Sequence, residues 1–504
     1  MPILHPGPKK SGIYWGKRLS FKKQEGSVKY NNTGYHRFRK ALFLVLLAGV
    51  GAAFGCDSTS PIPLCSRPEI ISSRFELPAT NVLSALITAH VRATDSIALR
   101  FGIAGGPLES WTPAVTEAGD SALVPLLGLR DLTRYDVQAV AFNDCTTTPG
   151  PMLTFTTDKL PADLPKFSAS GVDPSPGYVT FAAGNYGMAI DNTGRAAWYH
   201  RFANGPGLNF QPQPNGRYTA RPLAMNAGEI AKWVEVDPLG NVTRTLTCAE
   251  GLQPRLHDLL AESNGSYWLM CDRIQTVDLS SSGGPSQARV MGTGVQHISG
   301  DGKLLFDWSA FDHIDVELQD VDGPDRTANP INWTHGNAFD LDSDGNLLLS
   351  FRNLNEIIKI NTRTGAVMWR MGGSHNQFSF VNSPLPAFVR QHGVRSIGAG
   401  RLQLLDNLGD PRGSRAERYE YDEKARTVRL TGSVASSAGV IALIGGTTQS
   451  LPGGRVLVSF GNGGSVEEFD AAGNMTWKID GNAGYVFRAQ RIRSLYSPGV
   501  SDPH

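Results

Sequence analysis

The feature that most constrains the fold is a repeat of about 35–50 residues that runs through the chain from about residue 175. Each unit has an alternating strand, a glycine turn, an apolar strand, a polar link and then the pattern x-x-D-x-x-G-x-x-x-W. One such unit cannot bury both of its faces, so neighbouring copies must stack. The repeat predicts an all-β fold with a six-bladed β-propeller over residues 175–498, four antiparallel strands to a blade.

The copies differ in completeness, which bears on how the ring closes. The first copy supplies only the second half of a unit, and the segment YVFRAQRIRSLY (485–496) is expected to complete it as a sealing strand. The copies lie at 187–202, 209–246, 256–309, 334–373, 391–432 and 447–481.

A second domain is expected ahead of the repeats. Residues 66–158 contain short alternating segments between turn-rich stretches, which predicts a small β-sandwich of immunoglobulin or fibronectin type III kind. In GLRDLTRYDVQAVA, Tyr135 is expected to anchor a corner. Residues 159–174 are predicted to be a proline-stiffened linker. The abundance of glycine and proline, 56 and 31 residues, suits a protein rich in turns.

Residues 1–56 are predicted to be an export signal. A basic head precedes the apolar run ALFLVLLAGVGAAFGC, which is too short to span a membrane comfortably. Ala53-Phe54-Gly55-Cys56 is similar to a bacterial lipobox, with Cys56 as the lipidated residue; simple secretion or an uncleaved anchor is the alternative. We therefore expect a periplasmic protein on a lipid anchor.

The charge of the remaining chain excludes one class of partner. Residues 1–55 hold ten of the 47 Lys and Arg and one of the 46 Asp and Glu, which leaves 37 bases against 45 acids, a balance of −8. A mildly acidic body gives no support to nucleic-acid binding.

The cysteines fit an oxidising compartment. With Cys56 as the anchor, an even number remains, and four cysteines allow three pairings. Pairing Cys65 with Cys145 and Cys248 with Cys271 keeps each bond within one candidate domain; unpaired buried thiols are the alternative. No C-x-x-C spacing suggests zinc.

Residues 340–345 (DLDSDG) suggest a calcium loop at first sight. The twelfth position from Asp340 is Phe351, where such a loop needs a glutamate. The run also lies inside an apolar alternation, and Asp344-Gly345-Asn346 is a hairpin-turn signal. The sequence favours a structural turn over a calcium site.

The ends of that hairpin are the candidate site. Alignment of the repeats places His257, His335 and His392 at the same strand start in consecutive units, and Arg352 at the end of the second strand. Asp272-Arg273 and Asp406-Asn407 match Arg352 in the flanking units. A single histidine there could be a turn residue, and three could bind a metal. The arginine beside them argues for an anion instead, and no metal is expected.

An imidazole nucleophile surrounded by N–H donors suits transfer of a tetrahedral anionic group. Phosphoryl transfer normally needs Mg²⁺ and a glycine-rich loop, and no G-x-x-x-x-G-K-[ST] occurs in the sequence. Sulfuryl transfer needs no metal, and no cofactor is expected.

At these residues the sequence resembles the bacterial arylsulfate sulfotransferase family, whose members do not use 3′-phosphoadenylyl sulfate (PAPS). The resemblance covers about residues 160–496. It rests on the order and spacing of WTHGNAFDLDSDGNLLLSFRNLNEIIKINTRTGAVMWRMGG, RQHGVRSIGAGRLQLLDN with GSRAERYEYD, and GYVFRAQRIRSLY.

The resemblance implies a ping-pong reaction in which a phenolic sulfate ester donates its sulfuryl group to a histidine, which passes it to an acceptor phenol. His392 is then the nucleophile, His257 and His335 orient the group and assist proton transfer, and Arg352 binds its oxygens. Leu256 and Gly393 depart from the family pattern, which often has a histidine and an acidic residue there. Substrate-binding residues are expected among Asp406, Asn407, Trp333, Phe351, Phe378 and Phe380.

Two other functions compete with this one. The chain could be a non-catalytic cell-envelope propeller that serves as a binding or assembly module, in which case the four site residues should be dispensable. A quinone-dependent dehydrogenase is a further alternative, but those propellers usually have eight blades and a calcium ion. The expected partners are small phenolic donors and acceptors, with a homodimer as a further possibility.

Overall fold

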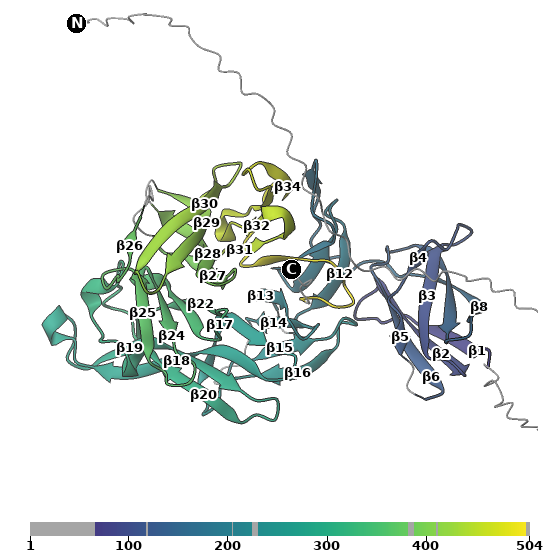
Figure 1. Cartoon of the computed structure of the whole chain (residues 1–504), viewed down its shortest axis with the longest axis horizontal. Coiled ribbons are helices and arrows are strands. Elements are labelled where there is room, and N and C mark those ends of the chain that lie inside the picture. Colours follow the sequence, from purple (N-terminus) through teal and green to yellow (C-terminus); the bar gives the residue numbers. More distant parts are fainter. Residues whose placement is uncertain are drawn as a thin grey trace, which may run out of the picture. The chain divides into compact units, whose positions relative to one another are not determined.

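The computed structural model describes residues 66–499, apart from 117–118, 204, 224–229, 382–387 and 410–411. The chain is all-β, and Figure 1 shows its strands as antiparallel sheets. Among the described residues no helix is long and apolar enough to cross a membrane. The predicted signal segment, the lipidation residue Cys56 and Cys65 lie outside the described residues.

Two sheets form the first part of the described chain, where a sandwich was expected. Their shared core holds alternating side chains such as Ile87, Leu99, Val124 and Val137. Tyr135 accepts a hydrogen bond from the Arg130 N–H at 2.9 Å through its hydroxyl, which is the corner contact predicted for it. One sheet has the order β1 (Glu69–Glu76), β2 (Ser84–Arg92), β6 (Ser121–Leu127); the other has β4 (Ser110–Trp111), β3 (Ser96–Ile103), β7 (Arg134–Phe142), β8 (Thr147–Thr156), with β5 (Val115–Thr116) beside β3.

Six further sheets of four or five strands follow in the described part of the chain, and each contains one repeat. The first three are β12 (Ala196–Arg201), β11 (Tyr186–Ile190), β10 (Tyr178–Ala183), β35 (Ala489–Ile492); β13 (Gly207–Pro212), β14 (Tyr218–Pro222), β15 (Trp233–Val236), β16 (Val242–Leu246); and β17 (Gln253–Ala261), β18 (Tyr267–Val277), β19 (Ala288–Ile298), β20 (Leu304–Ser309), with β21 (Ile331–Asn332) beside β19. The tryptophan that ends the repeat pattern, such as Trp198 or Trp369, is buried between sheets.

The other three sheets continue the same plan. They are β22 (Gly336–Leu341), β23 (Leu347–Phe351), β24 (Glu356–Ile360), β25 (Val367–Gly372); β27 (His392–Ser396), β28 (Arg401–Gly409), β29 (Gly413–Asp422), β30 (Thr427–Ala435), β26 (Ser379–Phe380); and β31 (Thr447–Ser450), β32 (Val456–Ser459), β33 (Val466–Phe469), β34 (Met475–Ile479), β9 (Ala169–Gly171). Short 3-10 turns connect some strands: η1 (Ser280–Ser282), η2 (Ala310–Asp312), η3 (Leu318–Asp320), η4 (Arg352–Leu354), η5 (Pro452–Gly454) and η6 (Gly461–Gly463).

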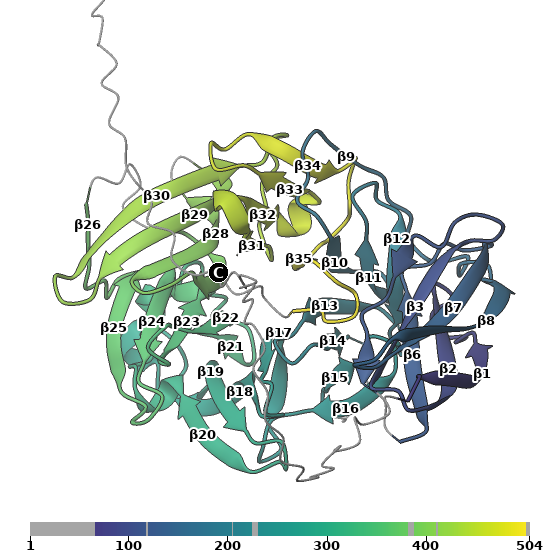
Figure 2. The same cartoon turned by 45° about the vertical axis from the view of Figure 1, so that its right-hand side comes forward.

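The innermost strands of the six sheets contact one another in a circle. β13 contacts β17, β17 contacts β22, β22 contacts β27, and β27 contacts β31, while β35 contacts both β31 and β13. Figure 2 shows these strands around a common centre. The ends of the inner strands therefore meet at the same place, although they are far apart in the sequence.

Strands from both ends of the repeat region pair with strands that are distant in the sequence. The C-terminal strand β35 pairs with β10, from Tyr178↔Ile492 to Phe181↔Ala489, as predicted for segment 485–496. The N-terminal strand β9 pairs with β34 on the outer edge of the last sheet, so part of the segment expected to be a linker is a strand. Pairing of this kind satisfies the edge of a sheet that would otherwise be open.

Side-chain amides join neighbouring sheets. In each case a buried or partly buried amide donates to a backbone carbonyl of the next sheet, and buried carbonyls need such partners. The contacts are Asn209 to His257 at 2.7 Å, Asn337 to Gln391 at 2.7 Å, Gln403 to Thr448 at 3.1 Å and Gln449 to Arg491 at 3.0 Å.

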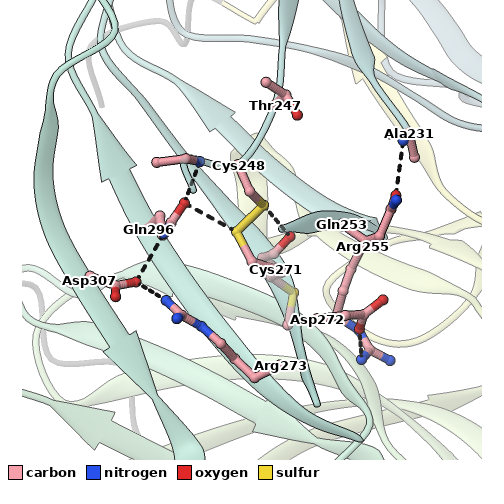
Figure 3. The surroundings of a disulfide bond; sticks show 12 residues. Ala231, Thr247, Cys248, Gln253, Arg255, Cys271, Asp272, Arg273, Gln296 and Asp307 are labelled. Carbon is pink, nitrogen blue, oxygen red and sulfur yellow. Dashed lines mark hydrogen bonds and ion pairs between the residues drawn. A yellow bond between two sulfur atoms is a disulfide. The ribbon is translucent and has the colours of Figure 1, made fainter. Parts of the chain in front are cut away.

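Cys248 and Cys271 form the predicted disulfide, with their Cα atoms 6.2 Å apart. Figure 3 shows it beside Gln296, which accepts a hydrogen bond from the Ala249 N–H. Cys145 is also disulfide-bonded. Its predicted partner, Cys65, lies outside the described residues.

Candidate active site

The predicted histidines lie on, or directly before, three neighbouring inner strands, and the arginine follows the second strand of one of these sheets. His335 directly precedes β22, His392 begins β27, and Arg352 begins η4 after β23. His257 was expected at a strand start but lies inside β17, where the pairing with β18 is irregular between Pro254 and Leu259. The rings of His257 and His335 are 5.0 Å apart between centroids, and His392 and Arg352 are among the neighbours that lower the pKa of His257. The structure thus brings together the four residues that the register of the repeats singled out.

His392 is held as a single tautomer. Its Nδ1 is 2.9 Å from Asn407 Oδ1 and 3.1 Å from the Arg390 carbonyl oxygen, and both of these atoms only accept hydrogen bonds. Nδ1 therefore carries the proton and donates it. On the other side of the ring, Nε2 accepts a hydrogen bond from the Gly445 N–H at 3.2 Å. The lone pair of His392 is thus on Nε2.

The orientation of Asn407 is fixed by its own contacts. Its Nδ2 donates to the carbonyl oxygens of Ala442 at 2.9 Å and Gly445 at 3.0 Å, which leaves only Oδ1 to face His392. Asn407 is fully buried. The side chain therefore selects the His392 tautomer and at the same time holds residues 442–445 next to the ring.

The three imidazoles are neutral near pH 7. Burial lowers the pKa of His392 to about 4, with a further contribution from Arg352. Burial also lowers the pKa values of His257 and His335, and both residues are near the cations Arg255 and Arg352. Neutral histidines keep their lone pairs, and a neutral imidazole can act as a nucleophile or as a base.

His335 is strained and oriented. Its φ is +47°, a conformation that costs a non-glycine residue energy and that clusters at functional sites. Its Nδ1 accepts a hydrogen bond from Asn332 Nδ2 at 2.6 Å, so its proton is on Nε2. In contrast, Nδ1 of His257 is buried and has no hydrogen-bond partner.

Arg352 supplies the positive charge of the site. Its guanidinium donates to the Leu443 carbonyl oxygen at 3.1 Å and to Asn353 Oδ1 at 3.2 Å, while its Nε is buried without a partner. None of the ion pairs of the described residues joins Arg352 to a carboxylate, and burial beside Arg390 lowers its pKa to about 10. A partly buried cation with unused donors is a site for an anion.

Residues 441–446, which we call the mouth loop, cover the site. Asn407 and Arg352 bind its carbonyl oxygens, and Asn462 Oδ1 accepts from the Leu443 and Ile444 N–H groups at 2.8 and 3.1 Å. The loop carries exposed apolar side chains: Ile441, Leu443 and Ile444 are 43%, 46% and 43% exposed, beside Tyr485 at 39%. An apolar rim above an anion site suits a ligand that has an aromatic ring and a charged group.

Tyr485 and Phe487 are the aromatic residues that sequence reasoning missed as site residues. Their rings are 6.3 Å apart, Phe487 is 5.7 Å from the His257 ring, and a Cβ on Gly445 would come within 2.8 Å of Tyr485. The signal was in GYVFRAQRIRSLY, which was interpreted only as a closing strand.

The expected aromatic wall lies elsewhere. Trp333 and Phe351 are buried in the core of the third and fourth sheets, and Phe378 and Phe380 pack in the next core. Packing accounts for these four side chains, and their contact with a substrate stays a prediction. Periodicity alone does not distinguish an aromatic residue in a core from one that faces a site.

Asp406 and Asn407 have separate surroundings because neighbouring strand residues point to opposite faces. Asp406 turns away from His392, accepts from the Val389 N–H at 2.9 Å, and its pKa is raised to about 6 by burial. In the third sheet Asp272 pairs with Arg255 and Arg273 with Asp307, as Figure 3 shows. Of the residues matched to Arg352, only Asn407 contacts a site histidine.

Gly393 explains one departure from the family pattern. It has a φ of +65°, and a Cβ there would lie 3.1 Å from Thr447 and 3.2 Å from the Gly446 carbonyl oxygen. A larger side chain would be strained at this position and would press on the mouth loop.

The acidic turn of the β22–β23 hairpin holds an ammonium group. Lys359 Nζ is 2.7 Å from Asp342 and 2.9 Å from Asp344, and it also binds Glu423. Asp342, Asp344 and Glu423 are one of two groups in the described chain that could place metal ligands together; the other is Glu317, Asp320 and His375. The site histidines belong to neither. As predicted, the run 340–345 is part of a hairpin: its first two residues end β22, and the others form a turn closed by the Asp342 N–H to Asn346 oxygen bond at 2.8 Å.

A cavity of about 660 Å³ lies further along the inner strands, lined among others by Asp258, Asp340, Arg395 and Arg491. The four site residues do not line it. Its buried charges are internally paired, as in the 2.9 Å contact of Arg395 with Asp258. Arg488 Nη2 donates to the His257 carbonyl oxygen at 3.1 Å and lies 3.3 Å from Asp258, so it links the cavity wall to the site.

This all-β scaffold therefore holds a cation without a carboxylate partner near an imidazole of fixed tautomer, an arrangement that suits a group-transfer protein. The sequence model of the arylsulfotransferase (ASST) family matches residues 250–482. These residues include the four site residues and Asn407, and they belong to that family. The match points to aryl sulfotransferase activity in general.

Other comparisons give little more. No curated protein matches the chain. Among solved structures, a Bacteroides caccae protein of unknown function has a TM-score of 0.41 at 12% identity, covering 64% of this chain and 100% of that one. A streptogramin B lyase has 0.35 at 14%, covering 62% and 84%, and the virginiamycin B lyase of Staphylococcus aureus has 0.34 at 12%, covering 64% and 89%. Likenesses this distant do not identify an activity.

Proposed function

We propose that the protein transfers a sulfuryl group from a phenolic sulfate ester to an acceptor phenol through a sulfohistidine at His392, without PAPS. The observation that carries the proposal is the fixed tautomer of His392: Asn407 and the Arg390 carbonyl hold the proton on Nδ1, so the lone pair is on Nε2. The lowered pKa keeps this lone pair available at neutral pH.

In the first half-reaction Nε2 of His392 attacks sulfur while the bond from sulfur to the phenolic oxygen breaks. The phenol leaves as a phenolate with the bonding electron pair and takes its proton from water. At neutral pH His257 and His335 cannot protonate the leaving phenolate, because their lowered pKa values keep both rings in the neutral form; their part here is to bind sulfuryl oxygens through N–H groups. Arg352 balances the negative charge of the transferred group.

In the second half-reaction the oxygen of an acceptor phenol attacks sulfur and the bond to Nε2 breaks, which restores His392. The proton of the acceptor is released to water, because the lowered pKa values of His257 and His335 make both rings weak bases. The mouth loop and Tyr485 supply the apolar rim for the aromatic ring.

The proposal includes a scaffold and a location. We propose that the six sheets form a closed six-bladed propeller, supported by the circle of inner-strand contacts and the β10–β35 pairing, and that residues 66–158 form an immunoglobulin-like or fibronectin-like sandwich. Export to the periplasm on a lipid anchor at Cys56 is proposed from the sequence of residues 41–56.

Mass spectrometry of the protein mixed with 4-nitrophenyl sulfate tests the reaction. We expect one added SO₃ on the peptide that contains His392, and 4-nitrophenol release that continues only when an acceptor phenol is present. His392→Ala should abolish both, while His375→Ala, at an exposed histidine paired with Asp320, should change neither. If the intact protein gains no SO₃ and releases no nitrophenol with any of several acceptors, the alternative of a non-catalytic module stands.

A further inference from the structure

The mouth loop places a backbone donor directly on the nucleophile. The Gly445 N–H points at Nε2 of His392 at 3.2 Å, and the carbonyl of the same residue is held by Asn407, the side chain that orients the ring. One residue is thus tied to both nitrogens of His392, directly at Nε2 and through Asn407 at Nδ1. Such an arrangement fixes the distance between the donor and the nitrogen.

The loop is built to keep that donor in place. Gly445 and Gly446 have φ values of +70° and +98°, and a Cβ on Gly446 would come within 2.2 Å of Leu405. The Gly446 N–H donates to the Phe487 carbonyl oxygen at 2.9 Å, and the Ile444 carbonyl oxygen accepts from the Asn462 N–H at 3.1 Å. Only glycines allow this path of the chain without strain.

A donor aimed at the nucleophile nitrogen has a use during transfer. When Nε2 bonds to sulfur it can no longer accept a hydrogen bond, and the oxygens of the sulfuryl group then lie one bond from the nitrogen. Sulfur must take the position on Nε2 that the N–H occupies at rest, so a small shift of the loop moves the N–H aside and leaves it next to one of these oxygens. Donors held close to the charge that develops in a transition state stabilise that charge.

We propose that the backbone N–H of Gly445 is an oxyanion donor of the sulfuryl transfer: it caps Nε2 of His392 at rest and binds a sulfuryl oxygen once the bond from Nε2 to sulfur forms. This role rests on the proposed function. It adds a backbone group to the histidines and Arg352, and it makes Asn462, which holds the loop from behind, a positioning residue.

The sharpest test replaces Gly445 in the full chain by glycolic acid, which turns the preceding amide into an ester and removes the N–H without adding a side chain. Loss of an oxyanion donor should lower kcat with 4-nitrophenyl sulfate about 100-fold. The pKa of His392, followed by NMR, should rise because Nε2 loses a donor that favours the neutral ring. The same ester at Gly453, in an exposed turn with nothing within 4 Å of a built Cβ, is the control.

The two possible roles of the Gly445 N–H predict opposite changes in kcat for the ester variant. If the N–H only caps the resting nucleophile, its removal frees Nε2 and kcat stays equal or rises, and that outcome overturns the proposal. A wild-type protein that is silent towards every aryl sulfate overturns the proposed function instead, so the two failures are distinct. The melting temperature of each ester variant shows whether it is folded.

A second pair of variants applies if the ester variant does not fold. Asn462→Ala removes the acceptor of the Leu443 and Ile444 N–H groups, and Asn482→Ala removes a comparable contact, Oδ1 to the Gly484 N–H at 2.7 Å, in a neighbouring turn. We expect Asn462→Ala to lower kcat about tenfold with a smaller change in KM, because a misplaced donor affects the transition state more than binding. Equal kcat values for the two variants contradict the positioning role.

Discussion

The two ends of the β22–β23 hairpin differ in how their charges are compensated. At the turn, Asp342, Asp344 and Glu423 surround the buried ammonium of Lys359, and every charge has a partner. At the other end, His335 and Arg352 lie without a carboxylate partner. The acidic turn, which we call the closed end, is the more conspicuous motif, but its charges are paired within the protein. The end with His335 and Arg352, which we call the open end, keeps unused hydrogen-bond donors, and unused buried donors indicate a ligand.

The largest effect is expected at the open end. Arg352→Gln removes the charge that faces the transferred group and should lower kcat/KM for 4-nitrophenyl sulfate about 1,000-fold, as for loss of a strong electrostatic contact. The unfolding free energy should not fall, because the variant buries no unpaired cation. Steady-state kinetics and a denaturant titration measure kcat/KM and the unfolding free energy of the variant. A large loss of stability with little loss of kcat/KM would show that Arg352 has a structural role and not a functional one.

Lys359→Met is the matched change at the closed end. It leaves three carboxylates together without their cation, and breaking such a pair costs about 3 kcal/mol or more of unfolding free energy. The kcat of the folded fraction should be unchanged, because the ammonium contacts no site residue. A lower kcat with an unchanged unfolding free energy would show instead that Lys359 and its carboxylates contribute to the reaction.

Asn407→Ala should lower kcat about 100-fold, since His392 loses the acceptor that keeps its proton on Nδ1. Asn407→Asp keeps an acceptor there and should raise the pKa of His392, because a carboxylate favours the imidazolium. The ¹⁵N shifts of the His392 ring report the tautomer in each variant. A ring that stays protonated on Nδ1 in Asn407→Ala would assign the tautomer to the Arg390 carbonyl alone.

The pH profile should be broad. Because the pKa of His392 is lowered to about 4, the nucleophile stays neutral on acidification well below the usual histidine range. The kcat/KM should fall about tenfold per pH unit only below pH 4. Initial rates with an aryl sulfate whose phenol does not titrate in this range measure it; a fall centred near pH 6.5 contradicts the assignment of His392.

The smallest effect concerns the rim. Leu443→Ser replaces an exposed apolar side chain of the mouth loop and should raise the KM for acceptor phenols a few-fold, as expected for a partly buried apolar contact, with kcat nearly unchanged. Leu132→Ser, at an exposed apolar residue of the first domain, is the control. Equal KM values for the two variants would place the acceptor ring elsewhere.

The arrangement of the six sheets could be predicted because each sheet corresponds to one copy of the sequence repeat. The alternation of strands, the glycine turns and the incomplete first copy predicted both the sheets and the β10–β35 pairing. The segment 159–174 was expected to be only a linker, whereas β9 adds a strand to the last sheet. Three residues, Ala169–Gly171, are too few for a period to be recognised, and their partner lies about 300 residues away.

What the sequence determined by itself is the register of the site: matching positions in consecutive repeats placed His257, His335 and His392 on neighbouring inner strands and Arg352 after the second strand of one of these sheets. Only the tertiary structure decided which neighbours act on them. Asn407 rather than Asp406 faces His392, Gly445 caps Nε2, and Tyr485 lies at the rim. The reason is physical: a repeat fixes positions along each strand, whereas contacts between sheets depend on side-chain direction and on loops that the repeat does not share.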